Sequence, residues 1–184
     1  MKITLCKLIA ALSIATSGMA SAEPSSYAGQ ETRQIKALST EEVHGYLSGK
    51  GMGLAKAAEL NGYPGPAHVL ALANELDLNA DQRAKTQAVF AAMSTDAASI
   101  GTTLIDTEHR LDRSFAEKTI DQALLAELLD RIGALQAQLR GVHLSAHLAQ
   151  VTILTPDQRK HYDQLRGYSG IKPPAAAHVG HAHH

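Results

Sequence analysis

Apolar residues recur at alternating steps of three and four in the second half of the chain, and they hold that spacing for about four heptads. The positions are Leu125, Leu128, Ile132, Leu135, Leu139, Val142, Ala146, Ala149 and Ile153. Such a repeat predicts a long helix whose apolar face packs against a second helix. A similar but interrupted stripe comes earlier, at Phe90, Met93, Ala97, Ile100, Leu104, Leu111 and Phe115.

The break between the two stripes, at residues 116–119, indicates how the two helices connect. A break this short lets them turn back on each other as an antiparallel hairpin. Each arm would be about 50 Å long at 1.5 Å per residue. We therefore expect an all-α fold, in which a long antiparallel helical hairpin over 77–168 is accompanied by short flanking helices.

Short helices are predicted in the segment 39–76. Ser39 and Glu42 have the spacing of a capping box, in which the cap side chain and the acid three residues later each accept a backbone N–H. Glycines and prolines then divide the segment. The predicted helices cover 39–47, 54–60 and 66–76.

Residues 1–22 have the three parts of a cleaved secretory signal peptide. Lys2 and Lys7 supply the positive charge, an apolar run follows over 8–15, and Ala20-Ser21-Ala22 provides small residues for cleavage. We expect the protein to be exported across the inner membrane to the periplasm. The polar residues 23–38 are expected to form a flexible leader.

The charge and cysteine content of the exported chain excludes several functions. Without Lys2 and Lys7 it carries 15 Lys and Arg against 18 Asp and Glu, too few cations for a nucleic-acid surface. The one Cys, Cys6, leaves with the signal, so no thiolate nucleophile, Cys metal ligand or disulfide is expected. No later stretch is expected to be apolar enough for stable membrane insertion. With no Gly-rich phosphate loop after a strand and no serine elbow, we do not expect an enzyme.

The apolar face of the second helix is wider than one partner helix covers. Leu124, Leu144, Leu148 and Val151 lie beside the main stripe. A wide face on a long hairpin predicts a homodimer, in which a second hairpin covers it. Alternatively, the short helices of 39–76 fold back over it.

A five-residue motif occurs at two of the predicted helix junctions. Leu154-Thr155-Pro156-Asp157-Gln158 is a full Leu-Thr-x-x-Gln motif, and Leu78-Asn79-Ala80-Asp81-Gln82 is the same motif with Asn in place of Thr. Over about 68–168 the chain resembles the Spy/CpxP family of periplasmic stress proteins, and also the related CnrX-type heavy-metal sensors and zinc-binding ZraP proteins. The motif residues Leu78, Asn79, Gln82, Leu154, Thr155 and Gln158 also fit simple capping boxes with hydrophobic staples.

The resemblance implies two activities. Spy-like proteins form a curved helical dimer that holds unfolding proteins without ATP, whereas CnrX- and ZraP-like proteins bind transition metals through His and other ligands. The chain is slightly acidic where a Spy-like cradle is rich in Lys and Arg.

His143 and His147 are the candidate metal ligands of the hairpin. They lie four residues apart, so both rings lie on one helix face and can bind one ion. If the hairpin turns near residue 118, position 143 faces Met93, and a thioether beside an imidazole suits a softer ion such as copper. In CnrX-like proteins a His on the second long helix ligates metal, and either His is the nearest match. Alternatively, both pack beside the apolar stripe as structural residues.

Other candidate ligands lie at the two ends of the chain. His44 and His68, with Met52 between them, would complete a site if their segment folds over the hairpin. The tail, expected to be disordered over 169–184, is a His-rich tract that binds metal by composition or is a purification tag. Its histidines are His178, His181, His183 and His184.

Together these features predict a periplasmic envelope-stress protein that binds or senses a transition-metal ion, namely Zn, Cu, Ni or Co. The alternative is an ATP-independent holdase whose partners are unfolded periplasmic proteins. A third interpretation is a structural partner of an inner-membrane regulator.

Overall fold

A computed structural model describes residues 25–168, in which helices and turns occur and no strand. The chain divides into a short unit that ends at Glu31 and a large unit that begins at Thr32. The described part of the short unit consists of turns, closed by hydrogen bonds from the Ala28 and Gln30 amides to the Ser25 and Tyr27 carbonyls. The predicted signal peptide and the predicted His-rich tail lie outside the described residues.

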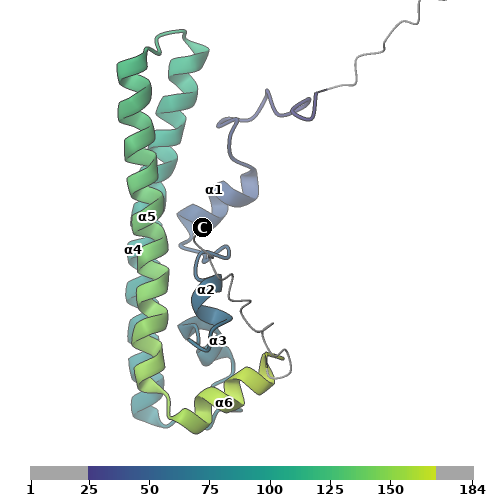
Figure 1. Ribbon diagram of the computed structural model, residues 1–184, viewed down its shortest axis with the longest axis vertical. Helices are drawn as coiled ribbons and strands as arrows, with labels where there is room; N and C mark the ends of the chain where they lie inside the picture. Colours follow the sequence, from purple (N-terminus) through teal and green to yellow (C-terminus); the bar gives the residue numbers. More distant parts are fainter. Residues whose placement is uncertain (1–24, 169–184) are drawn as a thin grey trace, which may run out of the picture. The chain divides into compact units, whose positions relative to one another are not determined.

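The large unit is built on two long antiparallel helices, α4 (Ala80–Ala116) and α5 (Gln122–Ile153), as Figure 1 shows. Asp121 caps the start of α5 by accepting the Leu124 amide. Between the helices the chain reverses at Lys118, which has a positive φ of 56°. The predicted hairpin and the position of its turn are therefore confirmed.

The apolar stripe of α5 forms a core in the half of the hairpin next to the turn. This cluster consists of Ala97, Leu104, Ile132, Leu135 and Leu139. Toward the other end the buried face departs from the heptad positions: Ala149 is exposed, while His147 and Gln150 are buried. A straight helix drifts by about 20° per heptad from a 3.5-residue repeat, so a strict seven-residue pattern loses register with the partner helix. Phe90 and Phe115, placed in the predicted stripe of α4, are also exposed.

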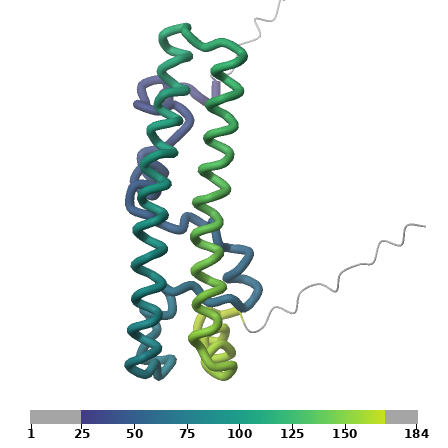
Figure 2. The backbone as a smooth tube through the Cα atoms, turned by 90° about the vertical axis from the view of Figure 1, so that its left-hand side faces the viewer, coloured from purple at the N-terminus to yellow at the C-terminus, as the bar shows by residue number. Residues whose placement is uncertain are grey.

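Three short helices run along one side of the hairpin (Figures 1 and 2). They are α1 (Thr40–Leu47), α2 (Lys56–Glu59) and α3 (Pro66–Ala71). The first helix comes so close to α4 that a Cβ at Gly101 would collide with the Tyr46 carbonyl. The N-terminal helices thus pack mainly on α4, and Leu148 of the wide apolar face of α5 stays 56% exposed, so the alternative in which they cover that face is not met at this residue. The second and third helices are shorter than predicted because turns occupy their flanks.

The predicted flexible leader is partly packed against the hairpin. Ile35 is buried, and both Lys36 nitrogens bind Asp112 of α4. The backbone N–H lies 3.1 Å from one carboxylate oxygen and the ammonium 2.8 Å from the other. The leader is therefore anchored from about residue 35 onward.

The two five-residue motifs meet at the end of the hairpin, where α6 (Pro156–Leu165) begins. Asn79 and Thr155 cap α4 and α6, each in a complete capping box with the glutamine three residues on. The two glutamines also pair with each other: Gln82 donates to Gln158 Oε1 at 2.8 Å, and Gln158 donates back at 3.1 Å. The capping interpretation is confirmed, and the amide pair fastens α4 to α6.

Leucines of both motifs belong to a second apolar cluster beside the amide pair. Its buried members are Val69, Ala73, Leu76, Leu78, Leu154 and Tyr162. Each motif therefore supplies both a helix cap and a buried leucine of the core at this end of the hairpin.

Among the helices of the described residues, α4 is long and apolar enough to span a membrane by length and composition. An 18-residue window of α4 has a mean hydropathy of 1.3, and 17% of that window is buried. The prediction that no stretch after the signal is this apolar is therefore wrong for α4. Alanines and other small apolar residues are spread around this helix. They raise its mean hydropathy although they do not form one apolar stripe. Length and composition do not distinguish such a span from a helix that packs against protein, as α4 packs against α5.

Candidate functional site

A cavity of about 630 Å³ lies between the hairpin and the short N-terminal helices. The Gly-rich loop 48–53 forms part of its wall, together with residues of α2 and α3. From the long helices Phe90, Met93, Ser94, His143 and His147 line it. This volume is typical of a small-ligand site.

His143 is the most buried polar side chain of this cavity. It is 2% exposed, and its Nε2 has no hydrogen-bond partner among residues 25–168. Burial, and to a lesser extent the neighbouring His147, lowers the pKa of the His143 imidazole. The ring is therefore neutral at physiological pH, which is the protonation state a metal ligand requires.

His147 lies one turn further along α5 and is held by the backbone. Its Nδ1 lies 2.7 Å from the Tyr63 carbonyl oxygen, and since a carbonyl only accepts, Nδ1 donates. This contact places the ring proton on Nδ1 and leaves the lone pair of a neutral ring on Nε2. A Cβ at Gly65 would stand 3.0 Å from that Nε2, so the absence of a side chain there makes room for the ring.

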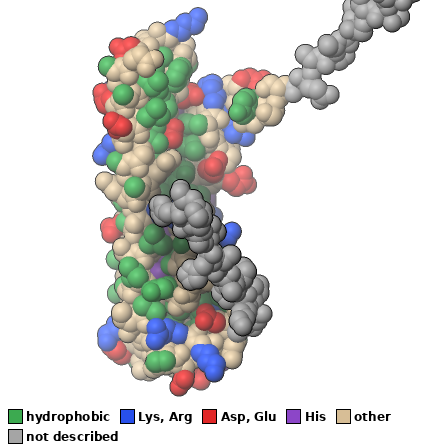
Figure 3. Space-filling view, in the orientation of Figure 1, with side chains coloured by type: hydrophobic (Ala, Val, Ile, Leu, Met, Phe, Trp, Pro, Cys, Tyr) green, Lys and Arg blue, Asp and Glu red, His purple; other side chains and the backbone are tan. Residues whose placement is uncertain are grey.

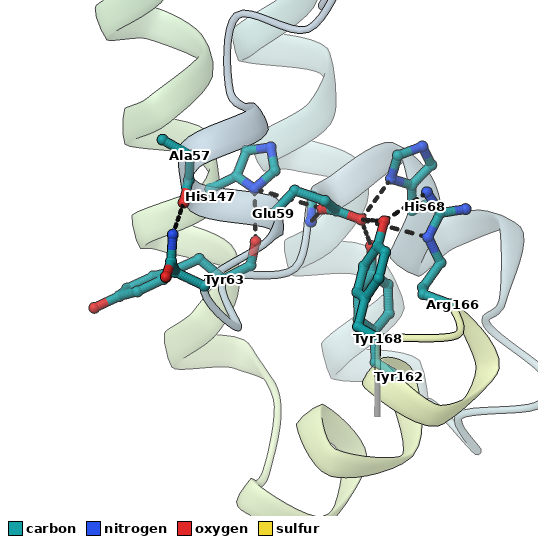
Figure 4. A network of polar contacts seen from close by, with 10 residues as sticks. Ala57, Glu59, Tyr63, His68, His147, Tyr162, Arg166 and Tyr168 are labelled. Carbon is teal, nitrogen blue, oxygen red and sulfur yellow. Dashed lines mark hydrogen bonds and ion pairs between the residues drawn. The ribbon is translucent and has the colours of Figure 1, made fainter. Parts of the chain in front are cut away.

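Glu59 of α2 lies near His147 and His68 and accepts hydrogen bonds from several elements (Figure 4). The Tyr162 hydroxyl of α6 donates at 2.5 Å, the Gly65 amide at 3.1 Å, and His68 Nδ1 of α3 lies at 3.2 Å. One carboxylate thus connects α2, α3 and α6.

A further hydroxyl, a guanidinium and an imidazole complete the surroundings of Glu59. Tyr168 donates at 3.2 Å, Arg166 Nε lies at 3.4 Å, and His147 Nδ1 lies at 3.8 Å. Burial alone would raise the pKa of this carboxyl, but the Tyr162 hydrogen bond, His68 and the other partners outweigh burial and hold the pKa below its usual value. Glu59 is therefore an ionised, fully engaged carboxylate.

The structure brings together four of the predicted ligands and separates the rest. His143, His147, Met93 and His68 all line the cavity, and so does Met52. His44 is exposed on α1 and is not among the lining residues. The predicted ligands His178, His181, His183 and His184 lie outside the described residues.

The predicted ligands do not form a closed coordination sphere. Within residues 25–168, no three His, Cys, Asp or Glu side chains come together as a metal-binding group. A structural metal site has four ligands, and a catalytic one has at least three from the protein. Any ion in this cavity must therefore use other donors, such as a thioether or water, or draw ligands together on binding.

Sequence reasoning missed the residues that surround Glu59. Tyr162 and Arg166 lie one turn apart on α6, which predicts a shared face but no partner. Glu59 lies 103 positions before Tyr162, so no spacing rule connects them. A single acid in a short apolar helix was the only available signal.

The comparisons with known proteins agree with the double motif. A family profile described as LTXXQ motif family protein matches residues 67–166, more than half of the chain. No curated protein and no solved structure matches the chain. The matched region begins in α3 and ends at Arg166, the C-cap of α6, so it contains the capping boxes of both motifs and the whole hairpin. The chain therefore belongs to the LTXXQ motif family, whose motif is the signature of Spy/CpxP-type proteins.

Proposed function

We propose that this protein is a periplasmic Spy/CpxP-type protein that binds a transition-metal ion in the cavity, with His143 and His147 as nitrogen ligands. The observation that carries the proposal is the buried Nε2 of His143, which no group of the described chain satisfies. A buried polar atom left in this state costs about 1–3 kcal/mol. A bound ion would remove that cost.

The setting of His147 supports the same function. In a metal-ligating histidine, the N–H of the second ring nitrogen commonly donates a hydrogen bond to a carbonyl or carboxylate. This hydrogen bond fixes the tautomer and orients the ring. The Tyr63 carbonyl does this for His147. With the two residues at helical spacing, both rings lie on one face of α5, where one ion could draw on their nitrogens.

The proposal is tested by titrating Zn(II), Cu(II), Ni(II) and Co(II) into a chain whose tail histidines 178, 181, 183 and 184 are changed to Ser. One ion should bind per chain and raise the melting temperature by mass action. His143→Ala or His147→Ala should abolish the shift. The exposed His44, changed to Ala, serves as the matched control and should leave the shift intact. A shift that survives in the His143→Ala/His147→Ala double variant would refute the proposal.

A second candidate function, ATP-independent holding of unfolded proteins, is favoured by the apolar surface of the hairpin. Leu129 and Leu148 of α5 are 50% and 56% exposed, and Phe115 of α4 is also exposed. Figure 3 shows apolar side chains gathered on the upper part of the hairpin between charged ones. Exposed apolar surface of this kind marks a site for protein contacts.

The holdase proposal is tested by aggregation of denatured clients with and without metal. Near-stoichiometric protection that Leu129→Ser/Leu148→Ser weakens would support it, and the lack of protection for several clients would refute it. The same surface is available to a second copy, and we propose a homodimer that sedimentation would detect. An inner-membrane regulator is the third proposed partner, detectable by crosslinking in cells.

A further inference from the structure

The distribution of methionine in this chain is unusual. It has four Met residues, of which Met1 and Met19 fall within the predicted signal peptide. The other two, Met52 and Met93, are 41 positions apart in sequence, and both line the cavity that contains His143. The buried members of the two core clusters are Leu, Ile, Val, Ala and Tyr residues. The two methionines outside the predicted signal peptide thus line the same cavity as the buried imidazole.

Met52 is held in a backbone conformation that it does not ordinarily adopt. Its φ is 41°, in the left-handed region that favours glycine, and it lies between Gly51 and Gly53. Side chains rarely adopt this region unless the surrounding structure imposes it, and such residues gather at ligand sites.

Glycines on two sides make room for Met52 and His143. A Cβ at Gly45 of α1 would collide with the Met52 sulfur. The place of a Cβ at Gly51 is 3.8 Å from His143 Nδ1, so the loop backbone lies directly against the imidazole. The Gly-rich loop 48–53 therefore places Met52 directly after the backbone that contacts His143, with the Met52 sulfur against α1 and its side chain 42% exposed.

The harder donors of the cavity are already occupied. Glu59 accepts from Tyr162, Tyr168 and the Gly65 amide, with Arg166 beside it. His68 contacts this same carboxylate. Divalent borderline ions prefer nitrogen and oxygen donors, whereas thioethers select soft ions, Cu(I) above all. The cavity therefore offers an imidazole and two uncharged sulfurs, without a spare carboxylate to offset a second positive charge.

We propose that the cavity binds a monovalent soft cation, Cu(I) or Ag(I), through the thioethers of Met52 and Met93 and the Nε2 of His143. This inference rests on the proposed metal-binding function and names the class of ion. Three uncharged donors are enough to coordinate a soft monovalent ion. They do not neutralise its single positive charge. The low charge keeps the cost of desolvation below that of a divalent ion. His147, one turn away, supplies a further nitrogen from the same wall.

The test uses the full chain with methionine methyl groups labelled with ¹³C, titrated with silver nitrate in chloride-free buffer and followed by NMR. The signals of Met52 and Met93 are assigned by their loss in Met52→Leu and Met93→Leu. Both should shift and saturate at one Ag(I) per chain. The tail contains no methionine, so its histidines cannot produce these shifts.

Affinity for Cu(I), measured by competition with a chromogenic chelator, gives the second readout. Met52→Leu, Met93→Leu and His143→Ala should each weaken it on the order of tenfold or more, since even outer-shell losses cost 10–100-fold. Phe90→Leu, a change in a cavity residue without a donor atom, is the matched control and should leave it unchanged.

The outcomes separate this inference from the broader proposal. Methionine signals that stay in place as Ag(I) is added, or Leu variants that bind Cu(I) as tightly as the parent, overturn the soft-ion site. If Zn(II), Ni(II) or Co(II) then binds through His143 and His147, the proposed function stands without it. If no ion of either class binds outside the tail, both fall.

Discussion

Near its turn the hairpin interior is apolar, with Leu104 of α4 packed among Ile132, Leu135 and Leu139 of α5. We call residues 97–139 the turn half. Toward α6, equivalent interior positions carry Thr86, His143, His147 and Gln150, and we call this end, with α2, α3 and α6, the motif half. The Gln150 amide donates to the Thr86 hydroxyl at 3.2 Å, so even the contact between the two long helices is polar there. The same two helices thus use apolar burial at one end and hydrogen bonds at the other.

The turn half of the hairpin thus provides apolar stabilisation, whereas the motif half carries the candidate functional site. Apolar burial is non-directional and tolerates any chain with the right pattern. Buried polar groups require specific partners, and a partly satisfied set costs free energy. The motif half contains such a set, including the unpaired His143 Nε2 within the described chain. A binding site needs such polar groups, so the motif half keeps them although an apolar interface between the helices would be more stable.

The largest expected effect tests the turn half. Leu135→Ala removes a side chain that is 2% exposed, and we expect it to lower the free energy of unfolding by about 2–5 kcal/mol. Leu129→Ala on the same helix is the matched control, and because that leucine is half exposed its cost should stay below about 1 kcal/mol. Urea denaturation measures both. Equal costs would mean that the turn half is no core.

The next effect tests the polar centre of the motif half. Glu59→Gln keeps the shape but removes the charge that Tyr162, Gly65 and Arg166 contact. We expect a loss of about 1–3 kcal/mol in the free energy of unfolding. Glu127→Gln, which breaks the exposed pair with Arg110, should cost about 0–1 kcal/mol.

The effect of Glu59→Gln on the free energy of unfolding should depend on pH, in a direction set by the lowered pKa of Glu59. The folded pKa of Glu59 is lowered, so its stabilisation is present above the unfolded value of about 4.3 and is lost as pH falls through the folded pKa. The difference between parent and variant should therefore shrink in acid. A difference that grows in acid would contradict the lowered pKa.

The turn half could be predicted from the sequence better than the motif half, because its contacts follow local patterns whereas those of the motif half join residues far apart in sequence. Capping boxes at Asn79 and Thr155 and the heptads around Leu135 are local patterns, so the hairpin, its turn and α6 could be predicted. The expectation that Met93 and His143 lie near each other came from the turn position, and both residues line the same cavity. The contact of Glu59 with Tyr162 joins residues far apart in sequence, and it depends on how α2 lies against α6, which no local pattern encodes. The heptad pattern also failed at Ala149, which is exposed, because a straight helix drifts away from a seven-residue repeat.

A smaller effect concerns His143 alone. Its pKa is lowered, so between that value and the unfolded value of about 6.5 the unfolded chain binds more protons. The free energy of unfolding should therefore fall as pH decreases from about 7.5 to 5.5, with a contribution of at most one proton, about 1.4 kcal/mol per pH unit. His143→Leu should flatten this slope in metal-free protein, and the exposed His44→Leu should not. An unchanged slope in His143→Leu would show that other groups cause the dependence.

The smallest effect compares a carboxylate at the turn half with Glu59. Asp112 also accepts a backbone N–H and a cation, both from Lys36, and its pKa is lowered by those contacts although burial opposes them. The Lys36 side chain, however, is half exposed, so solvent and salt screen the pair. We expect Asp112→Asn to cost about 0–1 kcal/mol and the cost to vanish near 1 M NaCl, where the screening length is about 3 Å.

Salt is the variable that distinguishes the two carboxylates. The Glu59 contacts with Tyr162 and the Gly65 amide involve buried, uncharged donors, so the Glu59→Gln effect should persist at the same NaCl concentration. Asp81→Asn, in an exposed pair with Lys85, sets the baseline for a surface carboxylate. If Asp112→Asn retained its full cost in high salt, the contact that anchors the leader would be of the same buried kind as Glu59. The division between the two halves would then lie in the number of partners and not in burial.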